Sequence, residues 1–277
     1  MSKRRSRSYT AAAAHQGGPH ELGQNFLVDE ATIDTITRLT ESAPDPIVEL
    51  CPGGGAVTVP LGESGRPMTA VELDPRHAGR LEQRTPDNVR VVREDVLRFR
   101  FPRHPHTLVG NLPFHLTTPI LRRVLAAEHW RTAVLLVQWE VARRRAGVGG
   151  ASMLTASWWP WYEFELHSRV PARSFRPVPS VDAGLITVHR RPRALVTERE
   201  AYQRFVKRVF TGPGRGLLRI LVRTGLLNGA GAAHRLRDLG IPPDALPKDL
   251  TAEQWAQLWR LCSGPARKSR GPRDRTP

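Results

Sequence analysis

The sequence predicts an open α/β sheet followed by a small α-helical domain. Up to about residue 190, short and nearly continuous apolar runs alternate with helical patterns, which is typical of strands buried on both faces of a parallel sheet. After residue 193 only helical patterns follow, with arginine and lysine on the positions that the apolar stripe leaves free. A chain of 277 residues with 40% hydrophobic residues is long enough to build such a core.

The elements follow one another in the order that this fold requires. Strands are predicted at residues 47–50, 68–73, 89–92, 107–109, 133–137, 161–170 and 184–189, the last two joined by a proline-rich loop at 171–179. Helices are predicted at residues 30–41, 119–127, 198–210, 216–226, 232–239 and 251–261, the second with Thr118 as cap and Pro119 at its first position. We therefore expect a sheet domain at 21–193, a helical domain at 194–262, and basic disordered tails at 1–20 and 263–277.

The basic charge is concentrated at the two ends of the chain. The net charge is +16, from 42 Lys and Arg against 26 Asp and Glu. Residues 1–20 hold four basic and no acidic side chains, residues 190–277 hold 19 basic and 7 acidic ones, and the segment between is neutral. Because clustered cations usually neutralise phosphates, this distribution predicts a nucleic-acid partner; the alternative is the solubility of an arginine-rich chain.

Cysteine usage and hydropathy disfavour several other classes. Cys51 and Cys262 are far apart and lack metal-ligand spacing, which argues against a disulfide scaffold and a zinc site. The basic N-terminus is not followed by the apolar stretch of a secretory signal, and no apolar run is long enough to span a membrane. A cytoplasmic protein is the expectation.

A glycine-rich turn and two acids mark a nucleoside-shaped site. The turn at residues 51–55 follows the first strand directly and lets the backbone approach a ligand closely; NAD binding or plain loop geometry would explain it equally well. Glu72 ends the next strand, where a carboxylate can bind both hydroxyls of a ribose. Asp95 follows the third strand and can accept the exocyclic amine of an adenine. No GK[ST] sequence follows the turn, which excludes a P-loop.

The turn Asn111-Leu112-Pro113-Phe114 follows the fourth strand and is the most specific signal. It resembles the (N/D)-(P/I/L)-P-(Y/F) motif of adenosylmethionine-dependent methyltransferases that modify amino groups. An adenine N6 is a poor nucleophile because its lone pair is delocalised into the ring. Acceptors at the Asn111 side chain and the Leu112 carbonyl would favour a tetrahedral nitrogen, Pro113 fixes the turn, and Phe114 offers a stacking face for an extruded base.

From about residue 22 to 188 the chain resembles the rRNA adenine N6-methyltransferases, and within them the erythromycin-resistance (Erm) enzymes. Six motifs match in order, among them Gly23 to Leu27, Gln138 to Ala142 and Phe175 to Val181. The resemblance implies a Rossmann-like sheet that uses S-adenosylmethionine. It implies cofactor contacts at Asn25, Leu27, Cys51, Gly53, Gly55, Glu72, Asp95 and Asn111. It implies catalytic positions at Asn111, Leu112, Pro113, Phe114 and Phe175, with Phe175 covering the base face opposite Phe114.

Two positions depart from the family pattern. Cys51 stands where the first glycine of the turn is usual, so the position tolerates a side chain and its ligand contact runs through the backbone. A catalytic role for this cysteine is disfavoured because nothing nearby in the sequence would lower its pKa. Phe114 replaces the commoner tyrosine, which keeps the stacking face and loses a phenolic hydrogen bond.

The run Arg143, Arg144 and Arg145 is predicted to contact RNA phosphate beside the catalytic edge, against the alternative of a solvated helix face. The tryptophan-rich segment at 157–162 has two interpretations of equal weight, core packing and stacking on RNA.

We expect methyl transfer from S-adenosylmethionine to N6 of an adenine in 23S rRNA, and resistance to macrolides, lincosamides and streptogramin B. One alternative is the related enzyme that dimethylates adenines of 16S rRNA, and another is a non-catalytic RNA-binding protein on the same scaffold. A DNA adenine methyltransferase is disfavoured, since those enzymes usually carry proline at the second motif position. A metal-free monomer is expected. The number of methyl groups, the choice between naked rRNA and an assembly intermediate, and a self-protection role stay open.

Overall fold

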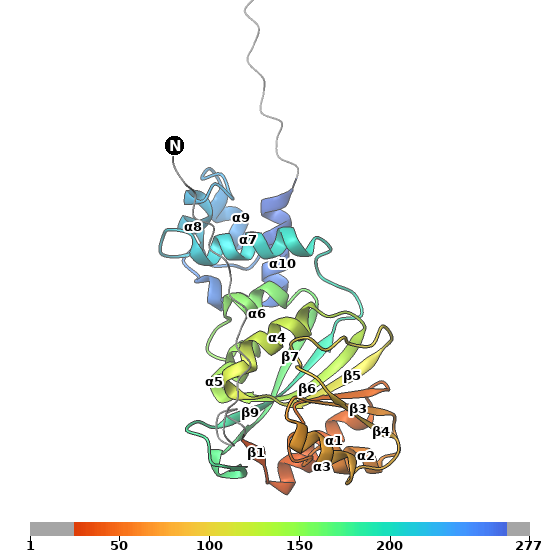
Figure 1. The fold of residues 1–277 in the computed structure, drawn as a ribbon. Helices are drawn as coiled ribbons and strands as arrows, with labels where there is room; N and C mark the ends of the chain where they lie inside the picture. Colours follow the sequence, from red (N-terminus) through yellow and green to blue (C-terminus); the bar gives the residue numbers. More distant parts are fainter. Residues whose placement is uncertain (1–24, 265–277) are drawn as a thin grey trace, which may run out of the picture.

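A seven-stranded sheet forms the centre of the computed structural model, which describes residues 25–264 (Figure 1). In spatial order its strands are β4 (Val89–Arg93), β3 (Met68–Glu72), β2 (Ile47–Leu50), β5 (His106–Asn111), β6 (Trp130–Gln138), β9 (Ala183–Arg190) and β7 (Tyr162–Val170). The first five strands pair in parallel, whereas β9 runs antiparallel to both β6 and β7. This confirms the predicted open α/β sheet.

Helices cover both faces of the sheet and meet it through two apolar clusters. One face packs against α1 (Glu30–Glu41), α2 (Thr58–Glu63) and α3 (Pro75–Glu82), and the other against α4 (Thr117–Ala126) and α5 (Trp139–Arg145). Local capping fixes where two of them begin. Asp29 accepts the Thr32 amide at 3.0 Å at the start of α1, and Asp74 caps α3 ahead of Pro75.

The structure corrects several sequence-based element assignments. α4 begins at Thr117, two residues before Pro119, because a 3-10 turn (η1, Phe114–Leu116) leads into it; Thr118 is therefore inside the helix and does not cap it. Four short helices were missed, namely α2, α3, α5 and α6 (Met153–Trp158). Two-residue strands were missed as well: β1 (Phe26–Leu27) and β8 (Phe175–Arg176) pair only with each other, and such short strands carry no periodicity.

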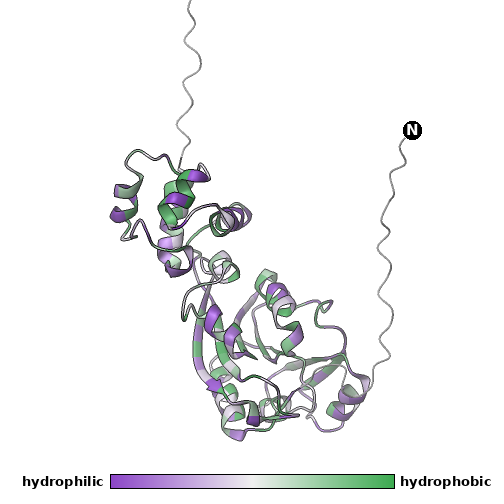
Figure 2. Ribbon diagram, turned by 90° about the vertical axis from the view of Figure 1, so that its left-hand side faces the viewer, coloured by the Kyte–Doolittle hydropathy of each residue, from purple (hydrophilic) through white to green (hydrophobic). Residues whose placement is uncertain are grey.

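A helical domain follows β9 and lies at one end of the sheet (Figures 1 and 2). It contains α7 (Arg199–Thr211), α8 (Leu217–Arg223), α9 (Ala232–Asp238) and α10 (Ala252–Ser263), close to the predicted ranges. Hydropathy alternates along these helices, as amphipathic helices require (Figure 2). The tails predicted at 1–20 and 263–277 lie outside the described residues, apart from Ser263, which ends α10, and Gly264.

Helix α6 joins the two parts of the molecule. It precedes β7 in the sequence, yet its Ala156 is buried in the apolar core of the helical domain. The Tyr202 hydroxyl of α7 donates to the Ala156 carbonyl at 3.0 Å, and the Trp161 and Tyr202 rings meet edge-on with centroids 5.6 Å apart. Trp158 is also buried. The tryptophan-rich segment is therefore core packing, and the helical core is completed by residues that come before position 193.

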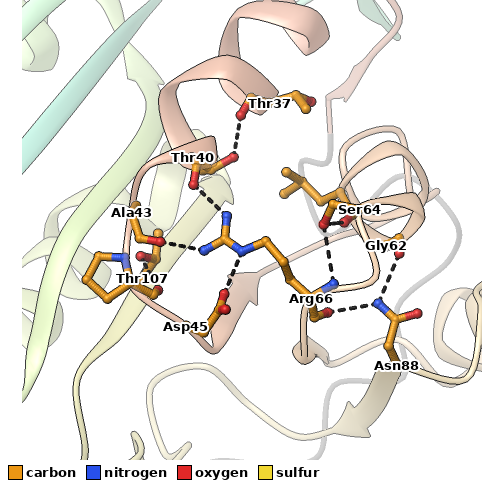
Figure 3. Close-up of polar contacts among 11 residues, drawn as sticks. Thr37, Thr40, Ala43, Asp45, Gly62, Ser64, Arg66, Asn88 and Thr107 are labelled. Atoms are coloured by element: carbon orange, nitrogen blue, oxygen red, sulfur yellow. Dashed lines mark hydrogen bonds and ion pairs between the residues drawn. The ribbon is translucent and has the colours of Figure 1, made fainter.

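Arg66 holds the amino end of β2 (Figure 3). Its Nε donates to Asp45 at 2.5 Å, and its two terminal nitrogens donate to the carbonyls of Thr40 and Ala43, both at 2.6 Å. The side chain is 17% exposed. Arg66 thereby adds charged donors to two carbonyls at and just after the end of α1, and it fixes the connection from α1 into β2.

We expect Arg66→Gln to lower the free energy of unfolding by about 2 kcal/mol, because partly buried carbonyls lose charged donors. Urea denaturation measures this. Arg38→Gln, on the exposed side of α1, serves as the control and should change stability by less than about 0.5 kcal/mol. Equal effects of the two substitutions would show that the Arg66 contacts contribute nothing.

Candidate active site

A cavity of about 280 Å³ opens at the carboxyl edge of the parallel strands. Three segments supply most of its walls: residues 25–27, the turn after β2, and the 111–114 motif after β5. Ligand sites of open α/β sheets lie at this edge, where parallel strands end together. The predicted residues Asn25, Leu27, Cys51 and Gly53, together with Asn111 to Phe114, line this cavity. Gly55, Glu72, Asp95 and Phe175 do not.

Left-handed backbone and close packing shape the turn after β2. Cys51, Gly53 and Gly55 have φ values of +59°, +54° and +84°. A Cβ at Gly53 would lie 2.9 Å from the Phe26 ring, and one at Gly55 would lie 2.5 Å from Leu81. Both glycines are thus required by their neighbours as well as by their backbone. Cys51 adopts a conformation that disfavours any side chain, which explains why glycine would fit this position better.

Glu72, at the end of β3, uses both carboxylate oxygens to hold backbone. Oε2 accepts the Gly53 amide at 2.9 Å, and Oε1 accepts the Asp74 amide at 2.8 Å. The side chain is 2% exposed. The carboxylate therefore joins the glycine turn to the turn that follows β3, and Glu72 is not among the residues that line the cavity.

Asp95 follows β4 and is half-buried, with Oδ1 accepting the Leu97 amide at 2.9 Å. Its charge reaches the cavity wall at Cys51. Burial raises the pKa of the Cys51 thiol to about 12, and the carboxylates of Glu72, Glu49 and Asp95 add to this rise. The thiol stays protonated at neutral pH, in agreement with the prediction that Cys51 is not a nucleophile.

Glu49 was missed as a site residue. It lies within the buried strand β2, lines the cavity and is 2% exposed. Burial raises its pKa to about 8; the Thr58 hydroxyl opposes this rise and the Glu72 carboxylate adds to it. Among residues 25–264, no hydrogen-bond partner reaches Oε2. An acid inside an otherwise apolar strand was the available sequence signal, and a cation in the cavity would satisfy it.

Asn111 is oriented by a contact with a segment 86 residues away. Its Nδ2 donates to the Asn25 carbonyl at 2.8 Å. Because the amide nitrogen is committed there, the opposite atom, Oδ1, is left as an acceptor; within the described part of the chain no donor reaches it. The next residue, Leu112, donates its amide to the Leu136 carbonyl of β6 at 3.0 Å, which fixes the start of the motif.

The two phenylalanines do not form the expected pair of parallel platforms. Phe114 is half-buried at the cavity, whereas Phe175 is fully buried, and their rings meet edge-on with centroids 6.4 Å apart and planes at 68°. No base fits between rings in this arrangement. Phe175 pairs with Leu27 in the β1–β8 ribbon, so it packs behind Phe114 as a support.

The arginine run on α5 has three different environments. Arg145 is 7% exposed and donates to the hydroxyls of Ser152 at 2.7 Å and Thr155 at 2.9 Å, so the prediction that it contacts phosphate is wrong. Its pKa is lowered to about 10 by burial and by neighbouring arginines. Arg143 is half-buried and pairs with Glu140 at 3.1 Å. Arg144 is exposed. A helix turns every 3.6 residues, which forces three consecutive side chains into different surroundings.

Residues 25–264 contain neither a metal-binding cluster nor a membrane-spanning helix. No cluster of three or more His, Cys, Asp or Glu side chains is placed to hold a metal ion. Within the same range no helix is long and apolar enough to cross a membrane.

Comparisons with known proteins point to one family. A family model described as ribosomal RNA adenine dimethylase matches residues 18–263. The chain is 52% identical to the mycinamicin-resistance protein MyrB of Micromonospora griseorubida, over 88% of this chain and 79% of MyrB. It is 49% identical to an rRNA adenine N-6-methyltransferase of Corynebacterium diphtheriae, over 77% and 85% of the two chains. The crystal structure of the 23S rRNA methyltransferase ErmE matches with a TM-score of 0.77 and 34% identity, over 86% and 99%.

The left-handed backbone at Cys51 predicts an inverted glycine preference. A protein is ordinarily less stable with glycine than with alanine at the same position. At a φ of +59° the order should reverse, and the Cys51→Gly variant should have a free energy of unfolding about 1 kcal/mol higher than that of Cys51→Ala. Both substitutions remove the sulfur, so their difference isolates the backbone. Guanidinium denaturation of the pair measures it, and a more stable alanine variant would contradict the strain assigned to this turn.

The raised pKa of Glu49 predicts that the ligand-free protein loses stability as pH rises. The folded protein keeps this proton up to about pH 8, whereas the unfolded chain releases it near 4.5. Unfolding therefore releases a proton between these values, and the free energy of unfolding falls with pH there. Glu49→Gln should remove this pH dependence. The free energy of unfolding of the variant, relative to that of the unsubstituted protein, should therefore rise by about 1.4 kcal/mol per pH unit between pH 6 and 8. Parallel stability profiles from urea denaturation would refute the assignment.

Proposed function

The chain belongs to the ribosomal RNA adenine dimethylase family, and from this we propose that it transfers methyl groups from S-adenosylmethionine to N6 of an adenine in 23S rRNA. The observation that carries the proposal is the orientation of Asn111, whose free amide oxygen lies in a cavity beside the glycine turn. The likeness to ErmE supports 23S rRNA as the substrate, and the likeness to MyrB supports macrolide resistance as the outcome. We extend this proposal to lincosamides and streptogramin B.

The residues around the cavity fit S-adenosylmethionine. Gly53 lines the cavity without a side chain, so the turn presents backbone to whatever fills it. Glu49 lines the cavity, its Oε2 has no hydrogen-bond partner within residues 25–264, and the carboxylate would suit the ammonium group of the cofactor's methionine part. Asn25, Leu27, Cys51 and Gly53 would hold the cofactor at the same wall, with Gly55 shaping the turn behind it.

Glu72 and Asp95 stand at the ends of the next two strands and are proposed to bind the adenosine part. Each Glu72 oxygen already accepts one backbone amide and has a second acceptor position for a ribose hydroxyl. Asp95 would accept the adenine amine. Both contacts require the ligand to extend from the cavity along the sheet edge toward β4.

The motif at 111–114 would bind the target base. S-adenosylmethionine supplies an activated methyl group on a sulfonium. Asn111 Oδ1 and the Leu112 carbonyl would accept hydrogen bonds from the two N6 hydrogens, which would localise the nitrogen lone pair for attack. The nitrogen–carbon bond would form as the carbon–sulfur bond breaks, and one N6 proton would leave to solvent. Phe114 would stack on the base, with Pro113 fixing the turn and Phe175 holding the Phe114 ring from behind.

Exposed cations are proposed to bind the RNA backbone. Arg144 is available on α5, and Arg143 can leave Glu140 for a phosphate, since an exposed ion pair is weak. The basic helical domain and the basic tails would add further contacts. We propose residues 21–193 as the catalytic domain and 194–262 as the RNA-binding domain of a cytoplasmic monomer that needs no metal.

Labelling tests the proposed function directly. The purified protein is incubated with tritiated S-adenosylmethionine and separate 23S and 16S rRNA, and the labelled adenine is mapped by primer-extension arrest. We expect label at one adenine of 23S rRNA, and the strength of the arrest separates one methyl group from two. Label in 16S rRNA would indicate the related small-subunit activity, and absence of label in both would indicate a non-catalytic RNA-binding protein.

Asn111→Ala should lower methyl transfer by roughly 10²–10³-fold, because an acceptor for the reacting amine is removed. Affinity for S-adenosylmethionine, measured by calorimetry, should stay within a few fold. Asn111→Asp keeps an acceptor and loses only the donor to Asn25, so it should retain more activity than Asn111→Ala. Undiminished transfer by the alanine variant would overturn the role given to the motif.

A further inference from the structure

Arg169 lies at the same edge of the sheet as Asn111. It is the penultimate residue of β7 and pairs with Gly184 of β9. The strands from β5 to β7 are neighbours in the order β5-β6-β9-β7, so three strand spacings, roughly 14 Å, separate the two positions across the sheet. That distance puts Arg169 beyond the reacting base but within reach of the nucleotides that flank it.

Two contacts fix the guanidinium of Arg169. Its Nε donates to Asp182 Oδ2 at 2.7 Å, and its central carbon lies 5.3 Å from the centre of the Trp139 ring. Asp182 is itself held, because its other carboxylate oxygen accepts the Ala172 amide at 2.8 Å and its carbonyl accepts the Trp139 amide at 2.9 Å. The side chain of Arg169 is nevertheless 59% exposed. A long side chain that is both ordered and exposed has already lost the rotamer freedom that binding would remove.

The outward part of this guanidinium is available to an anion. Of its nitrogens, only Nε has a partner within residues 25–264, which leaves both terminal amino groups for a ligand. Asp182 does not cancel the positive charge here, because exposed Arg173 is a second cation beside it. The pKa of Asp182 is lowered by hydrogen bonds from the Ala172 amide and Arg169 and, to a smaller extent, by the charge of Arg173. By contrast, the guanidinium groups of Arg66 and Arg190 donate hydrogen bonds to backbone carbonyls. A planar fork with two free donors matches a phosphate.

We propose that Arg169, clamped by Asp182 and stacked on Trp139, is a preformed binding site for an RNA phosphate next to the target adenine, with Asp182 as its positioning residue. The inference rests on the proposed function for the identity of the RNA. Asp182 ends the loop between β7 and β9, and its carboxylate also binds the Ala172 amide near the start of that loop. One carboxylate therefore positions both Arg169 and the loop that carries Phe175.

The test measures equilibrium binding to transcribed 23S rRNA from about 50 to about 200 mM KCl. Arg169→Gln should weaken binding several-fold and flatten the plot of log affinity against log salt by about 0.7–0.9, the contribution of one phosphate contact. Arg90→Gln is the matched control, because Arg90 is exposed on β4, the outermost strand on the side of the sheet away from β7. This substitution should leave the salt slope and the affinity unchanged. Arg169→Lys should keep the slope and recover only part of the affinity, since it loses the stacked fork.

Asp182→Asn separates positioning from charge. It keeps the arginine but weakens the clamp, so the salt slope should persist while affinity and kcat/KM for the RNA fall several-fold. Affinity for S-adenosylmethionine and the melting temperature should change little; a parallel loss of both would show that Asp182 only maintains the loop and would overturn its assignment.

Two results would refute the phosphate site, and a third would separate it from the proposed function. Equal behaviour of Arg169→Gln and Arg90→Gln would refute the site. Weaker binding with an unchanged salt slope would mean that Arg169 reads a base and not a phosphate. The salt slope is a binding measurement and does not require methyl transfer. If the unsubstituted protein transfers no methyl group, the proposed function is refuted, but a change of slope that is specific to Arg169→Gln still supports the phosphate site.

Discussion

The buried carboxylate of Glu72 is the constraint on which the cavity depends. By accepting the amides of Gly53 and Asp74, it ties together the two turns that follow neighbouring parallel strands. A charge in this place is tolerated because backbone donors satisfy it. It also disfavours a second charge nearby, which contributes to the raised pKa values of Glu49 and Cys51. One acid thus sets the shape of the cavity wall and adds to the effect of burial, which is the larger cause of the raised pKa values.

The β1–β8 ribbon connects the parts of the site that lie far apart in the sequence. Residue 25, directly before β1, orients Asn111; Phe26 packs over Gly53; and Leu27 pairs with Phe175, which supports Phe114. The ribbon has only two residues per strand and would not be stable alone. It persists because Leu27 and Phe175 are buried in the core beneath the sheet and the Phe26 ring packs edge-on against His77 of α3.

The arginines of the described chain divide into two groups with different tasks. Arg66, Arg145 and Arg190 are turned inward, where they pair carbonyls and hydroxyls at the ends of helices and strands. Others, such as Arg144 and Arg169, are exposed at or near the catalytic edge. Net charge therefore overstates the cationic surface, because a buried guanidinium is not available to RNA. The side chains that remain outside are the ones that salt dependence would count.

The sequence alone determined the strand order along the chain, the helical domain after residue 193 and the positions of Glu72, Asp95 and Asn111 at strand ends. These follow from local patterns and from the rule that parallel strands end at one edge. Only the tertiary structure decided that Glu49 lines the cavity, that Arg145 is buried, that α6 completes the helical core and that Phe175 lies behind Phe114. Each of these depends on contacts between distant segments or on the local degree of burial, and neither quantity is encoded in a short stretch of residues.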